Sequence, residues 1–223
     1  RYGVRSDQTD CCGKASGVLN FANGKPVKDA LIWVEDTRTG AVLGTATSSA
    51  DGNFALGGLP GGTYKMFAER LGSARRSLVA RDLGEIKVSA GESEPVEKTF
   101  ISGVSEVELR YLGFNGQLSE VPVLLNVGRT YVIYLGGSNL DPEKLRIGFS
   151  SPHITLVPGT VKSHDYGDDL SVISFEAAID PATPIGDYSV FVHTKTNQRA
   201  YLAGALTVDA FLNPYSTSTL FGR

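Results

Sequence analysis

One short segment gathers several side chains that could bind a metal ion. It is SHDYGDD at 163–169, which supplies His164 and three aspartates, and the weak candidate ligands are Asp165, Asp168 and Asp169. Carboxylate oxygens in such a loop suit calcium. However, the alternating ligands and central glycine of an EF-hand loop are missing, and an acidic hairpin tip explains the same residues. The pattern therefore favours a solvated turn, and we expect no bound metal.

Other arrangements of catalytic side chains are not found. The three histidines, His153, His164 and His193, lie in separate segments without ligand spacing, which argues against a metal triad. The chain has no G-x-S-x-G and no H-E-x-x-H, and GGLPGG lacks the lysine and hydroxyl of a phosphate loop. We expect no catalytic residues and no cofactor. A metal-dependent enzyme centred on 163–169 is the least favoured of three functional hypotheses.

The two cysteines, Cys11 and Cys12, are adjacent. They are too few for a metal site built from cysteine alone. Neighbouring cysteines can close only a strained ring. Free thiols, a bond between the two and a bond to a partner chain are all compatible with the sequence.

Positive charge concentrates in one predicted loop that holds Arg70, Arg75, Arg76 and Arg81, although the formal net charge of the chain is −3. Guanidinium groups bind carboxylates and phosphates in a forked geometry, so this loop is a candidate docking patch for a protein partner. A solvated loop is the alternative, because isolated surface charges contribute little. The patch is small and has no interleaved aromatics, so a nucleic-acid partner is not expected.

The elements that must position these residues are predicted to be short strands. In ALIWVEDT at 30–37, alternation places Leu31, Trp33 and Glu35 on one side of a strand. No segment shows a helical period of useful length. We predict an all-β fold of two tandem Ig-like/transthyretin-like β-sandwiches with extended N- and C-terminal segments. The predicted divisions are an N-terminal extension at 1–15, sandwiches at 16–102 and 103–209, and a C-terminal docking tail at 210–223.

Two segments, LPGGTY at 59–64 and TPIGDY at 183–188, share the pattern P-x-G-x-Y. The proline fixes the first turn position, the glycine accepts a conformation that other residues resist, and the tyrosine begins a strand. The tyrosine hydroxyl is expected to reach a nearby backbone carbonyl and so hold the corner of a sandwich. The six predicted corner residues are Pro60, Gly62, Tyr64, Pro184, Gly186 and Tyr188.

The first half resembles the carboxypeptidase regulatory-like domain family, whose fold is a transthyretin-like β-sandwich. The residues that carry this resemblance are Ser16-Gly17-Val18, Gly24, Pro26-Val27, Ala30, Thr39-Gly40, Asp51-Gly52-Asn53-Phe54, Leu59-Pro60 and Gly62-Thr63-Tyr64. After Tyr64 the chain departs from the family pattern, with Arg70-Leu71-Gly72 and the arginine-rich loop. The resemblance implies a non-catalytic module that serves as a folding aid, spacer or docking surface.

The second half is more weakly similar to the immunoglobulin-like IPT/TIG class. The matching positions are Gly136-Gly137-Ser138-Asn139-Leu140, Ile147, Pro184, Gly186 and Tyr188-Ser189-Val190. Many Ig-like sandwiches share these turns. The resemblance therefore implies the fold of this half and no function.

The two ends of the chain bear on its location and its partners. It begins at Arg1 and not at a methionine, so a signal peptide is expected to have been removed, although an artificial start would look the same. No apolar run reaches the ~20 residues of a membrane-spanning helix, so no transmembrane segment is expected. The C-terminal tail has little apolar surface of its own, and its predicted anchors for a partner are Phe211, Tyr215, Leu220 and Phe221.

The leading hypothesis is a non-catalytic structural and interaction subunit outside the cytoplasm, in the periplasm or at the cell surface. It would dock onto and stabilise a larger protein assembly, which could be membrane-bound. The alternative is a carbohydrate- or ligand-binding accessory module of a secreted or surface enzyme system, with Trp33, Tyr134 or Phe191 as stacking platforms. For Trp33, its place on an alternating strand favours core packing instead.

Overall fold

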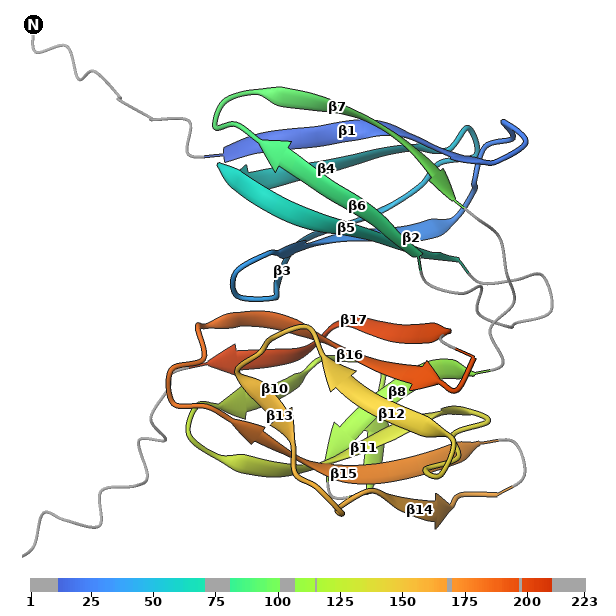
Figure 1. Ribbon diagram of the computed structural model, residues 1–223, viewed down its shortest axis with the longest axis vertical. Coiled ribbons are helices and arrows are strands. Elements are labelled where there is room, and N and C mark those ends of the chain that lie inside the picture. The colour runs from blue at the N-terminus through green and yellow to red at the C-terminus, as the bar shows by residue number, and fades with distance from the viewer. Residues whose placement is uncertain are drawn as a thin grey trace, which may run out of the picture.

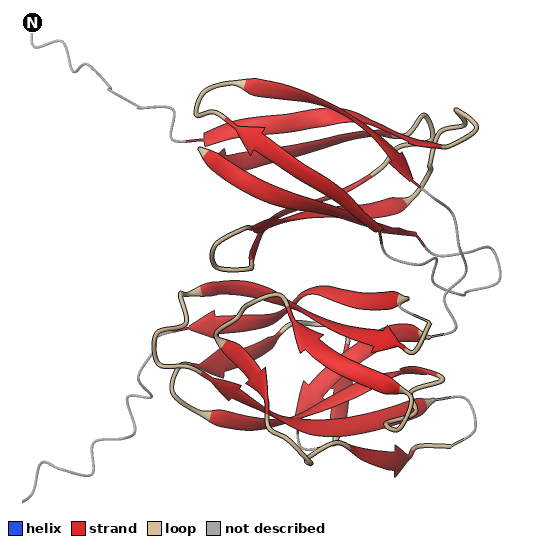
Figure 2. Cartoon of the chain, viewed as in Figure 1, coloured by secondary structure: helices blue, strands red, loops and turns tan. Residues whose placement is uncertain are grey.

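The computed structural model describes residues 12–70, 81–100, 107–114, 116–167, 170–196 and 198–209 (Figure 1). All regular secondary structure in these ranges is β-strand (Figure 2), which confirms the predicted all-β fold. The strands form two layered sandwiches, one above the other in Figure 1. The described part of the chain contains no helix that could span a membrane.

The N-terminal sandwich packs a three-stranded sheet, in the order β4-β1-β7, against the strands β3-β2-β5-β6. Alternation explains its core, because Ile32 and Val34 of β2 and Met66 and Ala68 of β5 point inward and are fully buried. The seven strands are β1 (Cys12–Phe21), β2 (Ala30–Asp36), β3 (Ala41–Thr47), β4 (Asn53–Pro60), β5 (Gly62–Arg70), β6 (Arg81–Val88) and β7 (Ser93–Phe100).

The C-terminal sandwich packs the sheet β13-β15-β11-β8-β9, with β14 beside β15, against β10-β17-β16 and β12. Ile133, Leu135, Ile173 and Phe175 lie fully buried in its core. The first five strands are β8 (Glu108–Phe114), β9 (Gln117–Ser119), β10 (Val123–Asn126), β11 (Thr130–Ser138) and β12 (Leu145–Phe149). The other five are β13 (Ile154–Leu156), β14 (Lys162–Asp165), β15 (Ser171–Ile179), β16 (Gly186–Thr194) and β17 (Arg199–Asp209).

The sequence ITLVPGTV at 154–161 predicts one strand, but β13 is shorter than this. It ends at Leu156, since Pro158 and Gly159 follow and Gly159 takes the left-handed conformation with φ 75°.

The two sandwiches share one continuous sheet. Strand β3 of the first pairs antiparallel with β16 of the second, at Val42 with Asp187 and at Ala41 with Tyr188. This short ladder joins the strands of both halves into an eight-stranded sheet. The sandwiches are therefore connected by backbone hydrogen bonding as well as by the chain between them.

Both P-x-G-x-Y segments form a tyrosine corner. Tyr64 donates its hydroxyl hydrogen to the Pro60 carbonyl at 2.5 Å, and Tyr188 donates to the Pro184 carbonyl at 2.7 Å. Both tyrosine rings are buried, one in each sandwich. Each hydroxyl thus holds the strand to the turn four residues before it.

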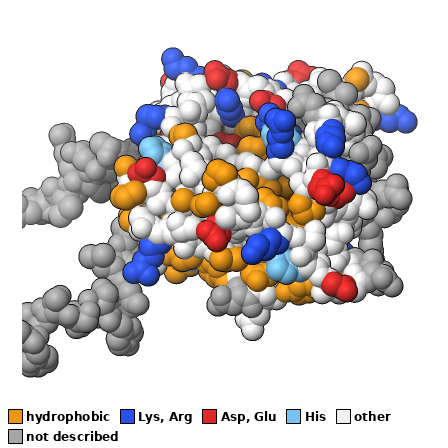
Figure 3. All heavy atoms as spheres, turned by 60° about the horizontal axis from the view of Figure 1, so that its bottom comes forward, with side chains coloured by type: hydrophobic (Ala, Val, Ile, Leu, Met, Phe, Trp, Pro, Cys, Tyr) orange, Lys and Arg blue, Asp and Glu red, His pale blue; other side chains and the backbone are white. Residues whose placement is uncertain are grey.

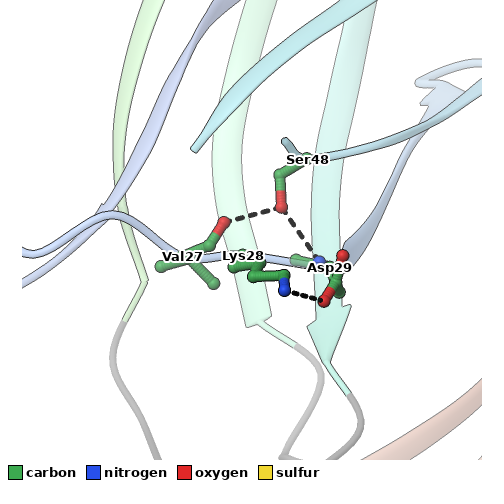
Figure 4. Close-up of polar contacts among 5 residues, drawn as sticks. Val27, Lys28, Asp29 and Ser48 are labelled. Atoms are coloured by element: carbon green, nitrogen blue, oxygen red, sulfur yellow. Dashed lines mark hydrogen bonds and ion pairs between the residues drawn. The ribbon is translucent and has the colours of Figure 1, made fainter. Parts of the chain in front are cut away.

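The segment that leads into β2 is fixed by a buried serine (Figure 4). The Ser48 hydroxyl donates to the Val27 carbonyl at 2.6 Å and accepts the backbone N–H of Ala30 at 2.9 Å. Between these contacts Asp29 takes a left-handed conformation with φ 56°, and its carboxylate lies 3.5 Å from Lys28 Nζ. Ser48 therefore determines where β2 begins.

Cys12, at the start of β1, is disulfide-bonded. The free-thiol alternative is therefore wrong for this residue. The other cysteine, Cys11, lies outside the described residues.

We expect Tyr64→Phe and Tyr188→Phe each to lower the free energy of unfolding by about 1–2 kcal/mol, because each leaves a proline carbonyl without its partner. Chemical denaturation measures this loss. Tyr166→Phe is the control, since Tyr166 donates to the Gly116 carbonyl at 2.7 Å but lies at the surface. An equal decrease in unfolding free energy in the control would show that the decrease does not depend on burial of the tyrosine.

Candidate functional site

The outward faces of the two sandwiches meet in an aromatic cluster. Trp33 of β2, Phe67 of β5 and Tyr201 of β17 are mutually packed, with ring centroids 5.3–5.6 Å apart. Trp33 is 0% exposed. Val42 of β3 completes the buried cluster, and Phe191 of β16 packs against it. From Ile32 to Glu35 both faces of β2 are thus buried, one in the N-terminal core and one against the second sandwich.

A buried carboxylate links the two sandwiches within this contact. Glu35 Oε1 accepts a hydrogen bond from Trp33 Nε1 and another from the Ser189 hydroxyl of β16, both at 2.9 Å. Glu35 is 7% exposed and Ser189 is fully buried. We call Trp33, Glu35, Phe67, Ser189 and Tyr201 the interdomain seam.

Burial dominates the electrostatics of the seam. Burial raises the pKa of Glu35 above its ordinary value of 4.5, and the hydrogen bonds from Trp33 and Ser189 only partly oppose this rise. Burial likewise raises the pKa of Tyr201 to about 12, against the opposing effect of Arg199. Tyr201 is therefore neutral at physiological pH, and its hydroxyl accepts a hydrogen bond from Arg199 Nη1 at 3.2 Å.

The turn between β2 and β3 also contacts the second sandwich. Asp36 Oδ1 caps it by accepting the backbone N–H groups of Arg38 at 2.7 Å and Thr39 at 2.8 Å. Gly40 follows with φ 72°, and a Cβ there would lie only 2.0 Å from the Ser150 carbonyl oxygen. Only glycine allows both this conformation and this approach.

A cleft of about 360 Å³ lies beside the seam and is lined by both sandwiches. Its walls include Asp29, Leu31 and Glu69 from the first sandwich and Arg110, Val121 and Ala205 from the second. Both charged and apolar side chains line it. No local sequence pattern predicts this cleft, because its walls come from segments far apart in the chain.

Most of the predicted arginine patch lies outside the described part of the chain, so the patch stays a prediction. Arg70 is half-buried, its guanidinium carbon lies 5.9 Å from the centroid of the Phe21 ring, and its Nε has no partner among the described residues. For Arg81 only the backbone in β6 is described, and Arg75 and Arg76 lie outside the described residues. The predicted tail anchors, Phe211, Tyr215, Leu220 and Phe221, also lie outside them.

The described part of the segment, 163–167, begins in β14, which pairs with the edge of β15, and the His164 side chain contacts both β15 and β11. His164 Nε2 lies 2.7 Å from the Ser174 hydroxyl, and its ring is 5.0 Å from that of Tyr134. Asp165 accepts the backbone N–H of Gly167 at 3.0 Å, as in a capped turn. Asp168 and Asp169 lie outside the described residues. The described residues contain no group of three side chains that could hold a metal ion.

Further apolar and aromatic side chains are exposed on β11 and just after β14. Val132, on the same side of β11 as Tyr134, is 47% exposed, and Tyr166 is also exposed. Figure 3, which turns this end of the molecule forward, shows hydrophobic side chains gathered across the middle of the face. We call Val132, Tyr134, His164 and Tyr166 the tyrosine face.

The three residues proposed as stacking platforms differ in exposure. The prediction is wrong for Trp33, because this side chain is completely buried in the seam. Phe191 is half-buried and carries the Arg199 guanidinium 5.6 Å from its ring centroid. Tyr134 is half-buried beside His164. The alternative of a carbohydrate-binding module thereby loses its main candidate.

Comparison with known protein families supports the sequence resemblance. Residues 15–100 match the carboxypeptidase regulatory-like domain family. This confirms the resemblance of the N-terminal half. The likeness of the C-terminal half to the IPT/TIG class stays a prediction. No curated protein matches the sequence significantly.

Solved structures with similar strand arrangements include BcpA, the major pilin subunit of Bacillus cereus. It is 12% identical, with a TM-score of 0.32, over 86% of this chain and 67% of BcpA. A putative carbohydrate binding protein from Pseudomonas aeruginosa is 18% identical, with a TM-score of 0.29, over 42% of this chain and 91% of its own. The glucan-utilization protein SGBP-B of Bacteroides ovatus is 14% identical, with a TM-score of 0.29, over 86% of this chain and 42% of its own. At these identities and TM-scores the similarities carry no functional argument.

We expect Gly40→Ala to weaken the contact between the sandwiches, because the new methyl group meets the Ser150 carbonyl. Gly24→Ala is a matched control, since Gly24 has φ 78° but no neighbouring atom within 4 Å of the place where a methyl group would lie. The control should cost about 1 kcal/mol of unfolding free energy, and Gly40→Ala about 1–3 kcal/mol more. Equal losses in denaturation experiments would show that the contact at Gly40 does not matter.

Glu35→Gln should change how stability depends on pH. The pKa of Glu35 is raised in the folded state. In a range of pH that begins near 4.5, the folded protein therefore keeps the proton on Glu35, whereas the unfolded chain has lost it. The contribution of Glu35 to stability therefore falls as the pH rises through that range. Relative to wild type, Glu35→Gln should gain stability with rising pH. A difference that stays constant across denaturation curves from acid to neutral pH would contradict this account.

Proposed function

We propose that this chain is a non-catalytic structural and interaction subunit that acts outside the cytoplasm by docking onto and stabilising a larger protein assembly. The observation that supports this proposal most is the structural role of Glu35. Among the described residues it is the only buried carboxylate, and both of its hydrogen bonds serve to hold Trp33 and Ser189 in the seam. The buried carboxylate of the described part of the chain thus joins domains and is not presented to a substrate.

Two further observations support a location outside the cytoplasm. Cys12 is disulfide-bonded, and disulfides persist in oxidising compartments. The N-terminal half also matches a domain family that the sequence resemblance associates with secreted and surface proteins. A secreted or periplasmic subunit agrees with both.

The tyrosine face is the proposed docking surface within the described residues. Exposed apolar side chains that cluster on one sheet are typical of contact surfaces, and tyrosine is enriched at the centres of interfaces. Val132, Tyr134 and Tyr166 supply such a cluster on β11 and the segment after β14. The arginine loop and the C-terminal tail are proposed as further contacts with the same assembly.

Native-mass analysis of the tagged full chain, extracted from its source cells, tests this proposal. Wild type should migrate in a particle much larger than its own 23.7 kDa. Val132→Asp should release it as a single chain, because a charge on the tyrosine face must be desolvated on docking. Leu124→Asp is the matched control, since Leu124 is an aliphatic strand residue that is 59% exposed, on β10.

The variants must first show unchanged unfolding midpoints, so that release from the particle reports docking and not misfolding. Wild type that migrates alone in every extract would overturn the proposed function. Retention of Val132→Asp in the large particle, or equal release of Leu124→Asp, would overturn the assignment of the tyrosine face.

A further inference from the structure

Three basic side chains form a row across neighbouring strands of the second sandwich. Arg146 of β12 pairs with His193 of β16, and His193 pairs with Arg199 of β17. Directly paired residues of antiparallel strands point to the same face of the sheet, and adjacent strands lie about 4.8 Å apart. We call these three residues the cationic row.

The row has no carboxylate partner in the described structure. Arg199 donates from Nε to His193 Nδ1 and from Nη1 to the Tyr201 hydroxyl, each at 3.2 Å. The three ion pairs found among the described residues involve other cations, Lys28, Arg110 and Lys144. His193 accepts the Arg199 hydrogen bond at Nδ1 and stands between the two arginines, so the guanidinium groups are not directly opposite one another. Both arginines lack a counter-ion among the described residues, and a bound anion would supply one.

An open hollow of about 590 Å³ lies against one end of the row. Arg146 and His193 line it together with Lys144, Lys195, Thr194 and Glu143. Glu143 is the only carboxylate in this lining, whereas Lys144 is already paired with Asp141 at 2.7 Å. Positive charge therefore exceeds negative charge in the hollow, and the space can admit a ligand group.

The aromatic ring beside the row is not free for stacking. The Arg199 guanidinium lies 5.6 Å from the centroid of Phe191, and Tyr201 packs 5.0 Å from it. A Cβ at Gly148 would fall 2.4 Å from the Phe191 ring, so this ring also lies directly on the backbone of β12. A sugar ring would find no open aromatic face here. The ligand must be held by its charge.

We propose that the cationic row binds an acidic polypeptide segment, with one side-chain carboxylate held by Arg146 in the hollow and another by Arg199 at the other end of the row, beside the hollow. Guanidinium groups bind carboxylates in a forked geometry, and Arg199 is already oriented by His193 and Tyr201. This inference rests on the proposed function, because it gives the chemistry of one partner contact. It adds a site on the sheet opposite the tyrosine face.

His193 reports occupancy of the site. Burial is the main cause that lowers the pKa of His193, and the positive charges of Arg199 and Arg146 lower it further. Phe191 packs edge-on against its ring, with centroids 5.2 Å apart, and the hollow adds Lys144, Lys195 and Glu143 around it. A bound carboxylate favours the protonated imidazole, so binding should raise the pKa of His193.

The test is NMR titration of the histidine ring protons in the full chain, with a short capped glutamate-rich peptide as the probe. The pKa of His193 should rise with added peptide, and that of His153 should not move. Binding should weaken with salt. Arg146→Gln and Arg199→Gln should each weaken it roughly fivefold. Arg129→Gln removes the same charge from the exposed turn before β11 and should leave binding unchanged.

An unchanged pKa of His193 at saturating peptide, or equal weakening by Arg129→Gln, would overturn the proposal. Binding of polygalacturonate but not of the peptide would also overturn it and assign an acidic polysaccharide instead. The native-mass experiment separates this result from the proposed function. If the chain enters the large particle but does not bind the peptide, only the proposed peptide site is overturned. If it binds the peptide but migrates alone, the proposed function is overturned.

Discussion

The arrangement of this molecule depends on one carboxylate oxygen that two sandwiches share. Glu35 Oε1 receives hydrogen bonds from Trp33 in its own domain and from Ser189 in the other. A buried carboxylate is costly unless it is well hydrogen-bonded, so removal of either donor leaves an uncompensated group between the domains. The aromatic rings around it exclude water and strengthen these bonds. The relative placement of the two sandwiches follows from this contact.

The consequences extend along the sheet. Because the seam holds β2 against β16 and β17, β3 can pair with β16 and the Asp36–Gly40 turn can approach the Ser150 backbone. The same placement forms the cleft beside Leu31 and Val121. The turn between β2 and β3 therefore does more than reverse the chain. It also forms part of the contact between the two sandwiches. The surfaces left for partners are therefore presented by one joined body and not by two independent modules.

Local patterns in the sequence predicted much of this fold but not its seam. Alternation in 30–37 placed Trp33 and Glu35 on one side of a strand, and glycine and proline signals located most turns, because these effects act over a few residues. The partner of Glu35 is 154 residues away, so no local pattern could reveal it. The available signal was a strand with large side chains on both faces, which is typical of burial on both sides. Short strands such as β9, β10 and β14 were missed because three or four residues carry no clear period.

The central claim is that the seam makes the two sandwiches unfold together, and differential scanning calorimetry of the full chain tests it most directly. We expect one transition for wild type, with equal calorimetric and van't Hoff enthalpies, and two transitions for Trp33→Ala. Two independent transitions in the wild-type protein would contradict this claim.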